Sequence, residues 1–478
     1  MIFNDITKNS RKEVCRTASK LHMSKKIKTV FICQECGYES PKWAGQCVCG
    51  AWNSLVEEKV SPIPSTKIGL NTPSNIKPTP ISQIEVKGRG PRINTGINEL
   101  NRVFGGGIVP GSLTLISGEP GIGKSTIIMQ TANNIALSGK KVLYISGEES
   151  TGQLKLRWER ICGEKSDNLF VLSETNIDNI ARLVDEFSVE FLIIDSIQTM
   201  YTEDISSAPG SVSQVRSCGN LLMSIGKKKN VPVFIVAHVT KSGELAGPKV
   251  VEHLVDCVLH FSGERNKELR ILRAYKNRFG TVSEIGAFQM EDEGLREVFN
   301  LSGTFLEDSE SQKEGSIVDA VYEGTRPLLL EIQALTAYTN MAFPRRNAIG
   351  IDTNRLSMII AVLERKCGLN LTNQDVYLNI VGGLKPAGTY TDLASALAIY
   401  SSFMNKTPKT DMPTVGEIGL TGSLRSVPHV DRIVKEAERM GFNKILIPAS
   451  CKLPSKFPSL SIEILRANSL GDAIKKAF

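Results

Sequence analysis

The sequence lacks the features that a membrane protein or a secreted protein would carry. No apolar run approaches the roughly 20 residues that a transmembrane helix requires. Residues 1–28 are basic and polar and contain no apolar middle region, which a secretory signal needs. The ten cysteines of this 478-residue chain do not form the dense framework of a small disulfide-bonded domain. We therefore expect a reducing compartment and no membrane partner.

A strong excess of one charge is also missing. Lysine and arginine number 57 and the acidic residues 50, and the net charge of +7 permits binding to nucleic acid without requiring it. The hydrophobic content of 41% is that of an ordinary globular protein. At 478 residues the chain is too long for a single core, and we expect two or three domains.

Shifts in composition divide the chain into segments. Cysteines cluster between 33 and 49, Pro, Ser, Thr and Asn recur in 57–85 with few large apolar groups, and 301–314 is acidic and polar. The predicted order is a basic, disordered tail at 1–28, a cysteine-containing mini-domain at 29–56, a linker at 57–85, a larger domain at 86–300, a linker at 301–314 and a mixed domain at 315–478. Met23 is an alternative to Met1 as the start of translation.

Between 86 and 298, apolar runs alternate with helical patterns. Short apolar runs separated by helices are typical of a buried parallel sheet, and they predict an α/β fold. The runs are Leu113–Ser117, Val142–Ser146, Phe191–Asp195, Val231–Ala237 and Leu269–Arg273. Beyond 315 the helical patterns are Asp352–Lys366, Asp392–Ser402 and Val430–Met440.

The strongest signal for chemistry is a complete phosphate-binding loop (P-loop). It follows the first apolar run and opens a helix over Thr126–Leu137, which is the context that the motif requires. Its glycines allow backbone N–H groups to face phosphates, and the helix N-terminus adds partial positive charge. We expect Lys124 to reach the β- and γ-phosphates of ATP and Ser125 to bind Mg²⁺. The predicted nucleotide-binding residues are Gly118, Glu119, Pro120, Gly121, Ile122, Gly123, Lys124, Ser125 and Thr126.

Polar residues at the ends of three further runs complete the predicted ATPase site. Asp195 comes at the carboxyl edge of the sheet, where it would hold Mg²⁺. Glu148 would orient or deprotonate the attacking water, with Glu149 as the fallback; alternatively, both residues only begin the next helix as favourable anions. His238 would hydrogen-bond the γ-phosphate, or it is structural. Lys124, Glu148 and Asp195 are thus the predicted catalytic residues.

Four cysteines near the N-terminus nearly fit a four-thiolate zinc site. They are Cys33, Cys36, Cys47 and Cys49. A short segment with few apolar residues needs such a site in order to fold. The alternatives are a weakened site or a cluster that is prone to oxidation.

Taken together, these motifs resemble one family, the bacterial RadA (Sms) DNA repair proteins. The resemblance runs from about residue 29 to the end and is far more specific than a P-loop alone. Its further pieces are Cys33–Tyr38, Pro41–Trp43, Asn94–Gly96, Gly147–Ser150, Gly210–Arg216, Lys276–Gly280 and Val381–Leu384. The family usually has two residues between its last two cysteines, whereas only Val48 separates Cys47 from Cys49 here.

The resemblance implies a zinc finger, a RecA-like ATPase and a C-terminal domain similar to the proteolytic domain of Lon. It implies ATP, Mg²⁺ and Zn²⁺ as cofactors, and single-stranded and branched DNA as partners, together with a RecA-type recombinase. Family members hydrolyse ATP in a DNA-stimulated reaction, form hexameric rings and promote branch migration of recombination intermediates. The implied location is the bacterial cytoplasm, with import into an organelle as the alternative.

The family's own signature in this chain is a short charged segment. It consists of Lys276, Asn277, Arg278, Phe279 and Gly280. Its cations would contact DNA phosphates or reach a neighbour's ATP as an arginine finger; the alternative is a solvated charged turn. Arg216, beside a Gly/Ser-rich loop, is a further candidate for DNA contact.

Two functions of other classes remain as alternatives. An ATP-dependent protease like Lon needs a Ser nucleophile and a Lys base. No Ser stands in Gly388–Ala394, where the nucleophile would fall, and His429–Arg432 occupies the position expected for the Lys, so proteolysis is disfavoured. Gly388 and Thr389 also replace the Glu-Pro common in the family. The other alternative is a module that uses ATP only as a switch, although Glu148 and Asp195 favour turnover.

Overall fold

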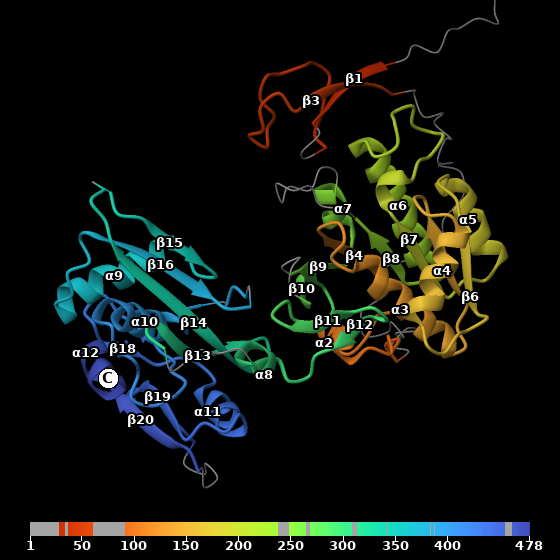
Figure 1. Ribbon diagram of the computed structural model, residues 1–478. Coiled ribbons are helices and arrows are strands. Elements are labelled where there is room, and N and C mark those ends of the chain that lie inside the picture. The colour runs from red at the N-terminus through yellow and green to blue at the C-terminus, as the bar shows by residue number, and fades with distance from the viewer. Residues whose placement is uncertain are drawn as a thin grey trace, which may run out of the picture.

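The computed structural model describes residues 28–33, 37–60, 91–237, 248–263, 268–307, 313–341, 343–382, 384–386, 388–454 and 461–478. Figure 1 shows three parts in chain order: a small N-terminal ribbon, a central α/β domain and a C-terminal domain. The predicted tail, except for its last residue, and most of the predicted linker at 57–85 lie outside the described residues, as do Cys36 and His238. Among the described helices, none is both long and apolar enough to cross a membrane.

The N-terminal ribbon is a small antiparallel sheet. Its strands are β1 (Lys28–Cys33), β2 (Glu39–Ser40) and β3 (Leu55–Val60), in the order β2-β1-β3. Strand β3 continues to Val60, so the ribbon extends beyond the predicted boundary at 56 because residues 57–60 pair with β1. Its buried apolar residues are few, and Ile32 packs with Val212 and Val250 of the central domain. Part of the hydrophobic core of the ribbon is therefore supplied by residues of the central domain.

The central domain is built on a nine-stranded sheet. The order is β12-β11-β10-β9-β4-β8-β7-β5-β6, in which β9, β4, β8, β7, β5 and β6 are parallel and β10, β11 and β12 continue antiparallel. The strands are β4 (Leu113–Gly118), β5 (Val142–Ser146), β6 (Leu169–Ser173), β7 (Phe191–Asp195), β8 (Val233–Val236), β9 (Cys257–Ser262), β10 (Leu269–Asn277), β11 (Ile285–Glu291) and β12 (Gly294–Glu297). The predicted α/β class is confirmed. The run Leu269–Arg273 was expected in the parallel sheet but pairs antiparallel on both sides, because its neighbours are joined to it by short connections.

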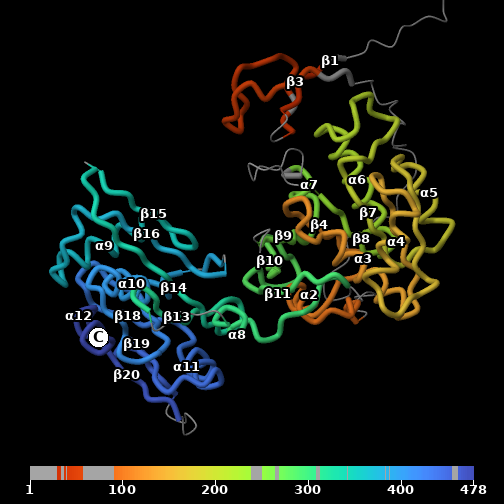
Figure 2. Tube along the Cα trace, viewed as in Figure 1, coloured from red at the N-terminus to blue at the C-terminus, as the bar shows by residue number. Residues whose placement is uncertain are grey.

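Helices cover both faces of this sheet, as Figures 1 and 2 show. One face packs against α2 (Asn98–Phe104), α3 (Lys124–Leu137) and α4 (Thr151–Ile161). The other packs against α5 (Ile177–Glu186), α6 (Val212–Lys229) and α7 (Pro248–Leu254), and a short 3-10 helix, η2 (Ile197–Thr199), follows β7. Parallel strands with both faces covered explain why the strands read as continuous apolar runs.

Local sequence signals set several helix starts. Ser150 caps α4 in a capping box with Gln153, and Ser211 caps α6 by accepting from the N–H of Gln214. In the C-terminal domain, Asp352 caps the helix predicted over 352–366, and Gly368 ends it in the left-handed conformation. These caps are local, so the helices could be predicted from the sequence.

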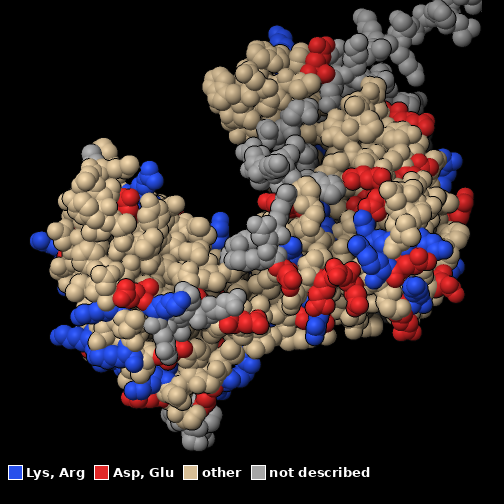
Figure 3. All heavy atoms as spheres, in the orientation of Figure 1, with Lys and Arg blue, Asp and Glu red and all other residues tan. Residues whose placement is uncertain are grey.

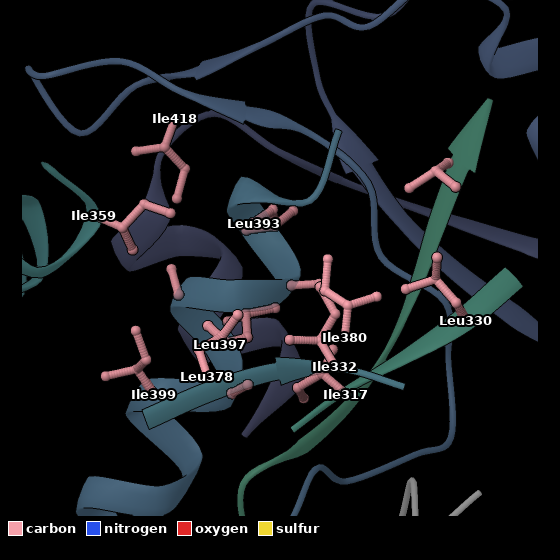
Figure 4. Packing of buried hydrophobic residues seen from close by; sticks show 14 of the residues in the cluster. Ile317, Leu330, Ile332, Ile359, Leu378, Ile380, Leu393, Leu397, Ile399 and Ile418 are labelled. Carbon is pink, nitrogen blue, oxygen red and sulfur yellow. The ribbon is translucent and has the colours of Figure 1, made fainter. Parts of the chain in front are cut away.

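The C-terminal domain combines a four-stranded sheet with helices on both faces. The sheet order is β13-β14-β16-β15, and the pairs β17-β18 and β19-β20 add smaller sheets. The strands are β13 (Ser316–Glu323), β14 (Arg326–Tyr338), β15 (Arg346–Ile349), β16 (Gln374–Ile380), β17 (Glu417–Ile418), β18 (Leu424–Arg425), β19 (Lys444–Pro448) and β20 (Glu463–Ala467). The helices are α9 (Thr353–Cys367), α10 (Asp392–Met404), α11 (Val430–Arg439) and α12 (Leu470–Ala477). Helices α9, α10 and α12 share a buried cluster on one face, and α11 packs against β13 and β14 on the other. Figure 4 shows Leu393 and Leu397 of α10 packed over the sheet beside Ile317, Ile332 and Ile380.

The central and C-terminal domains share one hydrophobic cluster. Ile271, Ile285 and Ala287 of the central sheet belong to the same buried cluster as Ile317 and Leu328 of the C-terminal domain. The segment predicted as a linker at 301–314 begins with helix α8 (Leu301–Leu306), and its Leu301 and Phe305 are buried in that cluster. The acidic composition of the segment concealed these apolar residues, and 308–312 lie outside the described part. The joint is therefore packed at this helix.

Candidate functional site

The P-loop lies at the carboxyl edge of the central sheet. It connects the end of β4 to the start of α3, which begins at Lys124. Gly123 has a φ of 114°, and a Cβ there would lie 2.8 Å from the Met290 side chain, so only glycine fits this position. The β11–β12 hairpin, which carries Met290, thus packs directly on the loop.

Lys124 is held within the loop by carbonyl groups. Its Nζ donates to the carbonyl oxygens of Gly118 at 2.7 Å and Glu119 at 2.9 Å. Burial lowers the pKa of Lys124 to about 8, and the nearby Asp195 and Glu148 act in the opposite direction. The three predicted catalytic residues are therefore gathered at this edge, with the two carboxylates close enough to act on the lysine charge.

Each of the two carboxylates is fixed by a buried hydroxyl group. The Tyr144 hydroxyl, from the middle of β5, donates to Asp195 Oδ2 at 2.5 Å. Ser196 Oγ, directly after β7, donates to Glu148 Oε1 at 2.6 Å. Burial, followed by the charge of Asp195, raises the pKa of Tyr144 well above its usual range, so this tyrosine stays a donor. The orientation of both acids is thus set before any ligand arrives.

The structure separates Glu148 from the alternative Glu149. Arg157 of α4 forms an ion pair with Glu149, while Glu148 faces Ser196. Ser146 also accepts the N–H of Glu149 at 2.9 Å. Glu149 is therefore paired with the middle of α4, while Glu148 contacts Ser196 after β7, and the choice of Glu148 over Glu149 stays a prediction.

A histidine that the sequence did not single out lies beside the loop. His260 of β9 pairs in register with Ser117, and its Nδ1 lies 3.1 Å from Ser117 Oγ. Its ring stacks on Tyr275 at 5.1 Å between centroids. Burial and the charge of Lys124 lower the pKa of His260, which favours the neutral ring. The only hint in the sequence was a polar residue inside an apolar strand.

The charged segment Lys276–Gly280 lies at the opposite edge of the same sheet. Asn277 pairs with Cys257, which pairs with Thr114 near the start of β4, whereas the P-loop follows the end of β4. The five residue steps from Leu113 to Gly118 separate the two edges by about 16 Å. Lys276 and Arg278 therefore do not meet the P-loop of their own chain.

Local contacts hold this segment in place. Lys276 Nζ donates to the carbonyl oxygens of Glu252 at 2.7 Å and His253 at 3.3 Å, at the end of α7. Asp256 Oδ1 lies 3.4 Å from Arg278 Nη1. Arg92 Nη2 donates to the Phe279 carbonyl at 2.7 Å. Gly280 lies in the turn that follows. The turn is thus an ordered element with an exposed Arg278.

The cysteines come together as a metal site requires. The Sγ atoms of Cys33, Cys47 and Cys49 all lie within 4.8 Å of one another, and those of Cys33 and Cys49 are 3.8 Å apart. Four sulfurs around Zn²⁺ at about 2.3 Å would be separated by about 3.8 Å. The one-residue spacing of Cys47 and Cys49 therefore does not keep either thiol out of the cluster. These thiols fit zinc.

Comparison with known proteins gives the same three parts. Family models described as Rubredoxin metal binding domain, AAA domain and Subunit ChlI of Mg-chelatase match residues 31–57, 85–244 and 341–451. A protein of Bacillus subtilis (strain 168) described as DNA repair protein RadA is 48% identical over 94% of this chain and 98% of its own length. Proteins of the same description from Halalkalibacterium halodurans and Listeria monocytogenes are 49% and 48% identical over 95% and 94% of this chain, and 99% and 98% of their own lengths. The chain belongs to the RadA family.

Solved structures similar to this chain cover less than half of it. A KaiC-like protein from Pyrococcus horikoshii OT3 is 19% identical, covers 43% of this chain and 98% of its own, and has a TM-score of 0.37. The RadB recombinase is 21% identical, covers 43% of this chain and 99% of its own, and has a TM-score of 0.33. The predicted resemblance to the RadA family is confirmed by the full-length relatives, and the predicted fold class by the sheet and the family models.

In this RadA-family chain, the positions that would serve proteolysis are occupied by structural contacts. Asp392, fully buried at the start of α10, forms an ion pair with Arg355 and accepts the N–H of Ile418 at 3.0 Å. Arg432 donates to the Tyr322 hydroxyl at 2.6 Å. A Ser nucleophile activated by Lys is not formed by these side chains, so the protease alternative is not favoured.

Proposed function

We propose that this chain is a DNA-dependent motor of recombinational DNA repair that binds single-stranded and branched DNA and promotes branch migration. ATP hydrolysis itself rests on the AAA match and the RadA relatives. The observation that carries the motor proposal is the placement of the charged segment and the P-loop at opposite edges of one sheet. A subunit built in this way would bind ATP at one edge of the sheet and carry, at the other edge, a cation that senses the nucleotide.

In the proposed reaction, Lys124 exchanges its two carbonyl contacts for the phosphates of ATP. Ser125 and Asp195 would hold Mg²⁺, which supplies positive charge to the phosphates. Glu148, oriented by Ser196, accepts a hydrogen bond from the attacking water. The remaining residues of the loop direct backbone N–H groups at the phosphates.

We propose a ring because one chain alone does not bring the cations of its charged segment to its own P-loop. Lys276 and Arg278 stand at the edge away from their own P-loop, so the ATP phosphates that they could reach are those of a neighbouring subunit. An arginine supplied in this way stabilises charge in the transition state. We therefore place ATP between subunits of a ring, for which the family resemblance implies six members, and hydrolysis changes the contact between neighbours.

DNA and protein partners complete the proposal. The names of the relatives refer to DNA repair. Figure 3 shows basic side chains gathered at the outer side of the C-terminal domain, near α12, where phosphates would be favoured. Arg216 is exposed on α6 and is a second candidate for DNA contact. The further expected partner is a RecA-type recombinase, and Zn²⁺ would be held by the cysteine cluster.

The first test is the steady-state ATPase rate with and without single-stranded DNA. The wild-type rate is expected to rise with DNA, and Lys124→Ala is expected to have no activity in either condition. An unchanged rate in a wild-type protein that hydrolyses ATP would instead support the nucleotide-switch alternative. DNA affinity should also fall steeply with salt, since phosphate contacts release counterions.

A mixing experiment tests whether the charged segment acts between subunits. Lys276→Ala and Lys124→Ala are each expected to be inactive alone. In mixed rings, an intact P-loop in one chain meets an intact Lys276 in its neighbour, so activity is expected to return in part. Activity that stays absent over all mixing ratios, with rings formed, would contradict action between subunits.

A further inference from the structure

A hollow of about 710 Å³ lies between the N-terminal ribbon and helices α6 and α7. Figures 1 and 2 show the ribbon seated over these two helices. Tyr38 and Val48 line the hollow from the ribbon, and Arg216 and His253 line it from the helices. None of the described residues that line it is acidic. It is remote from the P-loop in the sequence and plays no part in the hydrolysis described above.

The ribbon is anchored in a way that fixes Tyr38. A Cβ on Gly37 would lie 3.2 Å from Val212 of α6 and 3.4 Å from Val250 of α7, so the backbone approaches both helices closely. The Tyr38 carbonyl accepts the N–H of Cys33 at 2.9 Å, and the N–H of Gly37 donates to the Cys33 carbonyl. Tyr38, joined through its backbone to the expected zinc ligand Cys33, thus lies beside the two helices.

The chemistry of the lining is that of a site for a single nucleic-acid strand. Tyr38 is 44% exposed, and an exposed aromatic ring is the kind of side chain on which a base stacks. Arg216 offers a planar guanidinium suited to a phosphate, and His253 offers ring nitrogens close by. A volume of about 710 Å³ accommodates a ligand the size of one or two nucleotides. A base inside a duplex has both faces covered and cannot stack on a side chain, which excludes paired DNA here.

We propose that this hollow binds single-stranded DNA, with a base stacked on Tyr38 and the adjacent phosphate on Arg216. The ribbon then acts as a clamp that closes a strand against the motor domain. This inference rests on the proposed function, because it names the DNA site of the proposed motor. It gives the zinc-binding part a role beyond its own folding, since the backbone of Cys33 is hydrogen-bonded to that of Tyr38.

The test is the affinity of the full chain for a fluorescently labelled oligothymidine, measured by anisotropy. Tyr38→Ala is expected to weaken binding by about 5- to 150-fold, the range for loss of one base–aromatic stack, and Tyr38→Phe is expected to bind like the wild type. Trp43→Ala is the matched control, because Trp43 is an exposed aromatic of the same ribbon, 57% exposed, that does not line the hollow. The zinc content of each variant shows whether the ribbon remains folded.

Salt dependence separates the two contacts. Arg216→Ala is expected to reduce the slope of log affinity against log salt by about 0.7, as for one phosphate contact on a single strand, and Tyr38→Ala is expected to leave the slope unchanged. If wild-type protein binds and Tyr38→Ala, with zinc retained, binds as tightly as Trp43→Ala, the hollow is not the site. If the wild-type protein itself does not bind the oligonucleotide, the proposed function fails first. If Tyr38→Ala loses zinc, the deciding experiment is crosslinking of the wild-type protein to a strand that contains 5-iodouracil. A crosslink at Tyr38 is expected, and a crosslink at other residues but not at Tyr38 overturns the proposal.

Discussion

An ion pair buried at the joint between the central and C-terminal domains should be sensitive to a single substitution. Glu99 of α2 is 1% exposed, and Arg326, at the start of β14, binds it through both terminal nitrogens, one of them at 2.9 Å. Glu99 Oε2 also accepts the N–H of Ala287 at 3.1 Å. Arg326 belongs to the C-terminal domain and the other two residues to the central domain, so the pair ties the domains together.

Arg326→Met is expected to destabilise the chain by about 3–5 kcal/mol, since it leaves a buried carboxylate without its cation. Of the other described cations, Arg102 lies 3.7 Å from Glu99 and compensates only in part. In the double variant Glu99→Gln/Arg326→Met no charge is stranded and the amide oxygen still accepts from Ala287. We expect its cost to be smaller than that of Arg326→Met alone, with a coupling of about 1–3 kcal/mol.

Urea unfolding and hydrogen exchange at the joint measure this effect. Exchange of the Ala287 amide is expected to accelerate in Arg326→Met and to recover in the double variant. The matched control is Arg425→Met, which removes an exposed pair with Glu417 at 3.5 Å and should cost less than about 1 kcal/mol. The reasoning is refuted if Arg326→Met costs no more than Arg425→Met, or if the double variant is the least stable of the set.

Two further predictions concern the active site and the C-terminal core. Ser196→Ala removes the hydroxyl that donates to Glu148, and we expect kcat for ATP to fall by about 10- to 100-fold with KM little changed. Ser196→Thr keeps a hydroxyl and is expected to restore much of the activity. An unchanged kcat of Ser196→Ala in steady-state assays would show that the hydroxyl does not position the acid. Burial, and then the charge of Asp392, raises the pKa of Asp319 well above its usual range. Because the folded state binds this proton more tightly than the unfolded state, protonation of Asp319 stabilises the fold. This stabilisation is complete below the usual Asp pKa of about 3.9 and is lost as pH rises through the folded value. Asp319→Asn should therefore gain in thermal stability relative to the wild type between pH 5 and 8, and parallel curves for the two proteins would disprove a titrating Asp319.

Much of the fold was predictable because its signals are local. The run Val142–Ser146 matches β5 residue for residue, and the helix predicted over Thr126–Leu137 is α3 with two more residues at its start. The antiparallel place of β10 was not predictable, since strand direction depends on which segments meet. The helix at Leu301–Leu306 was hidden by acidic neighbours. Domain boundaries and the roles of the site residues remain predictions.

In the candidate site, the sequence identified the chemically reactive groups but not the residues that hold them in place. Asp195 and Glu148 follow apolar runs, and that position alone brings them to the carboxyl edge. Tyr144 looked like any residue of a buried strand. Its hydrogen bond to Asp195, which lies 51 positions further along the chain, depends on the pairing of β5 with β7. Arg157 likewise looked like a residue of an exposed helical face.

The sequence by itself determined that the chain binds nucleotide phosphates, that its central domain is α/β and that it resembles the RadA family. Those properties reside in short motifs and in periodicity, which residues close together in the chain express. Only the tertiary structure decided that Lys276 and Lys124 lie at opposite edges of one sheet, that Glu99 pairs with Arg326, and that Tyr38 and Arg216 line one hollow. These relations join segments that are distant in the sequence, and they are set by strand order and by packing between domains.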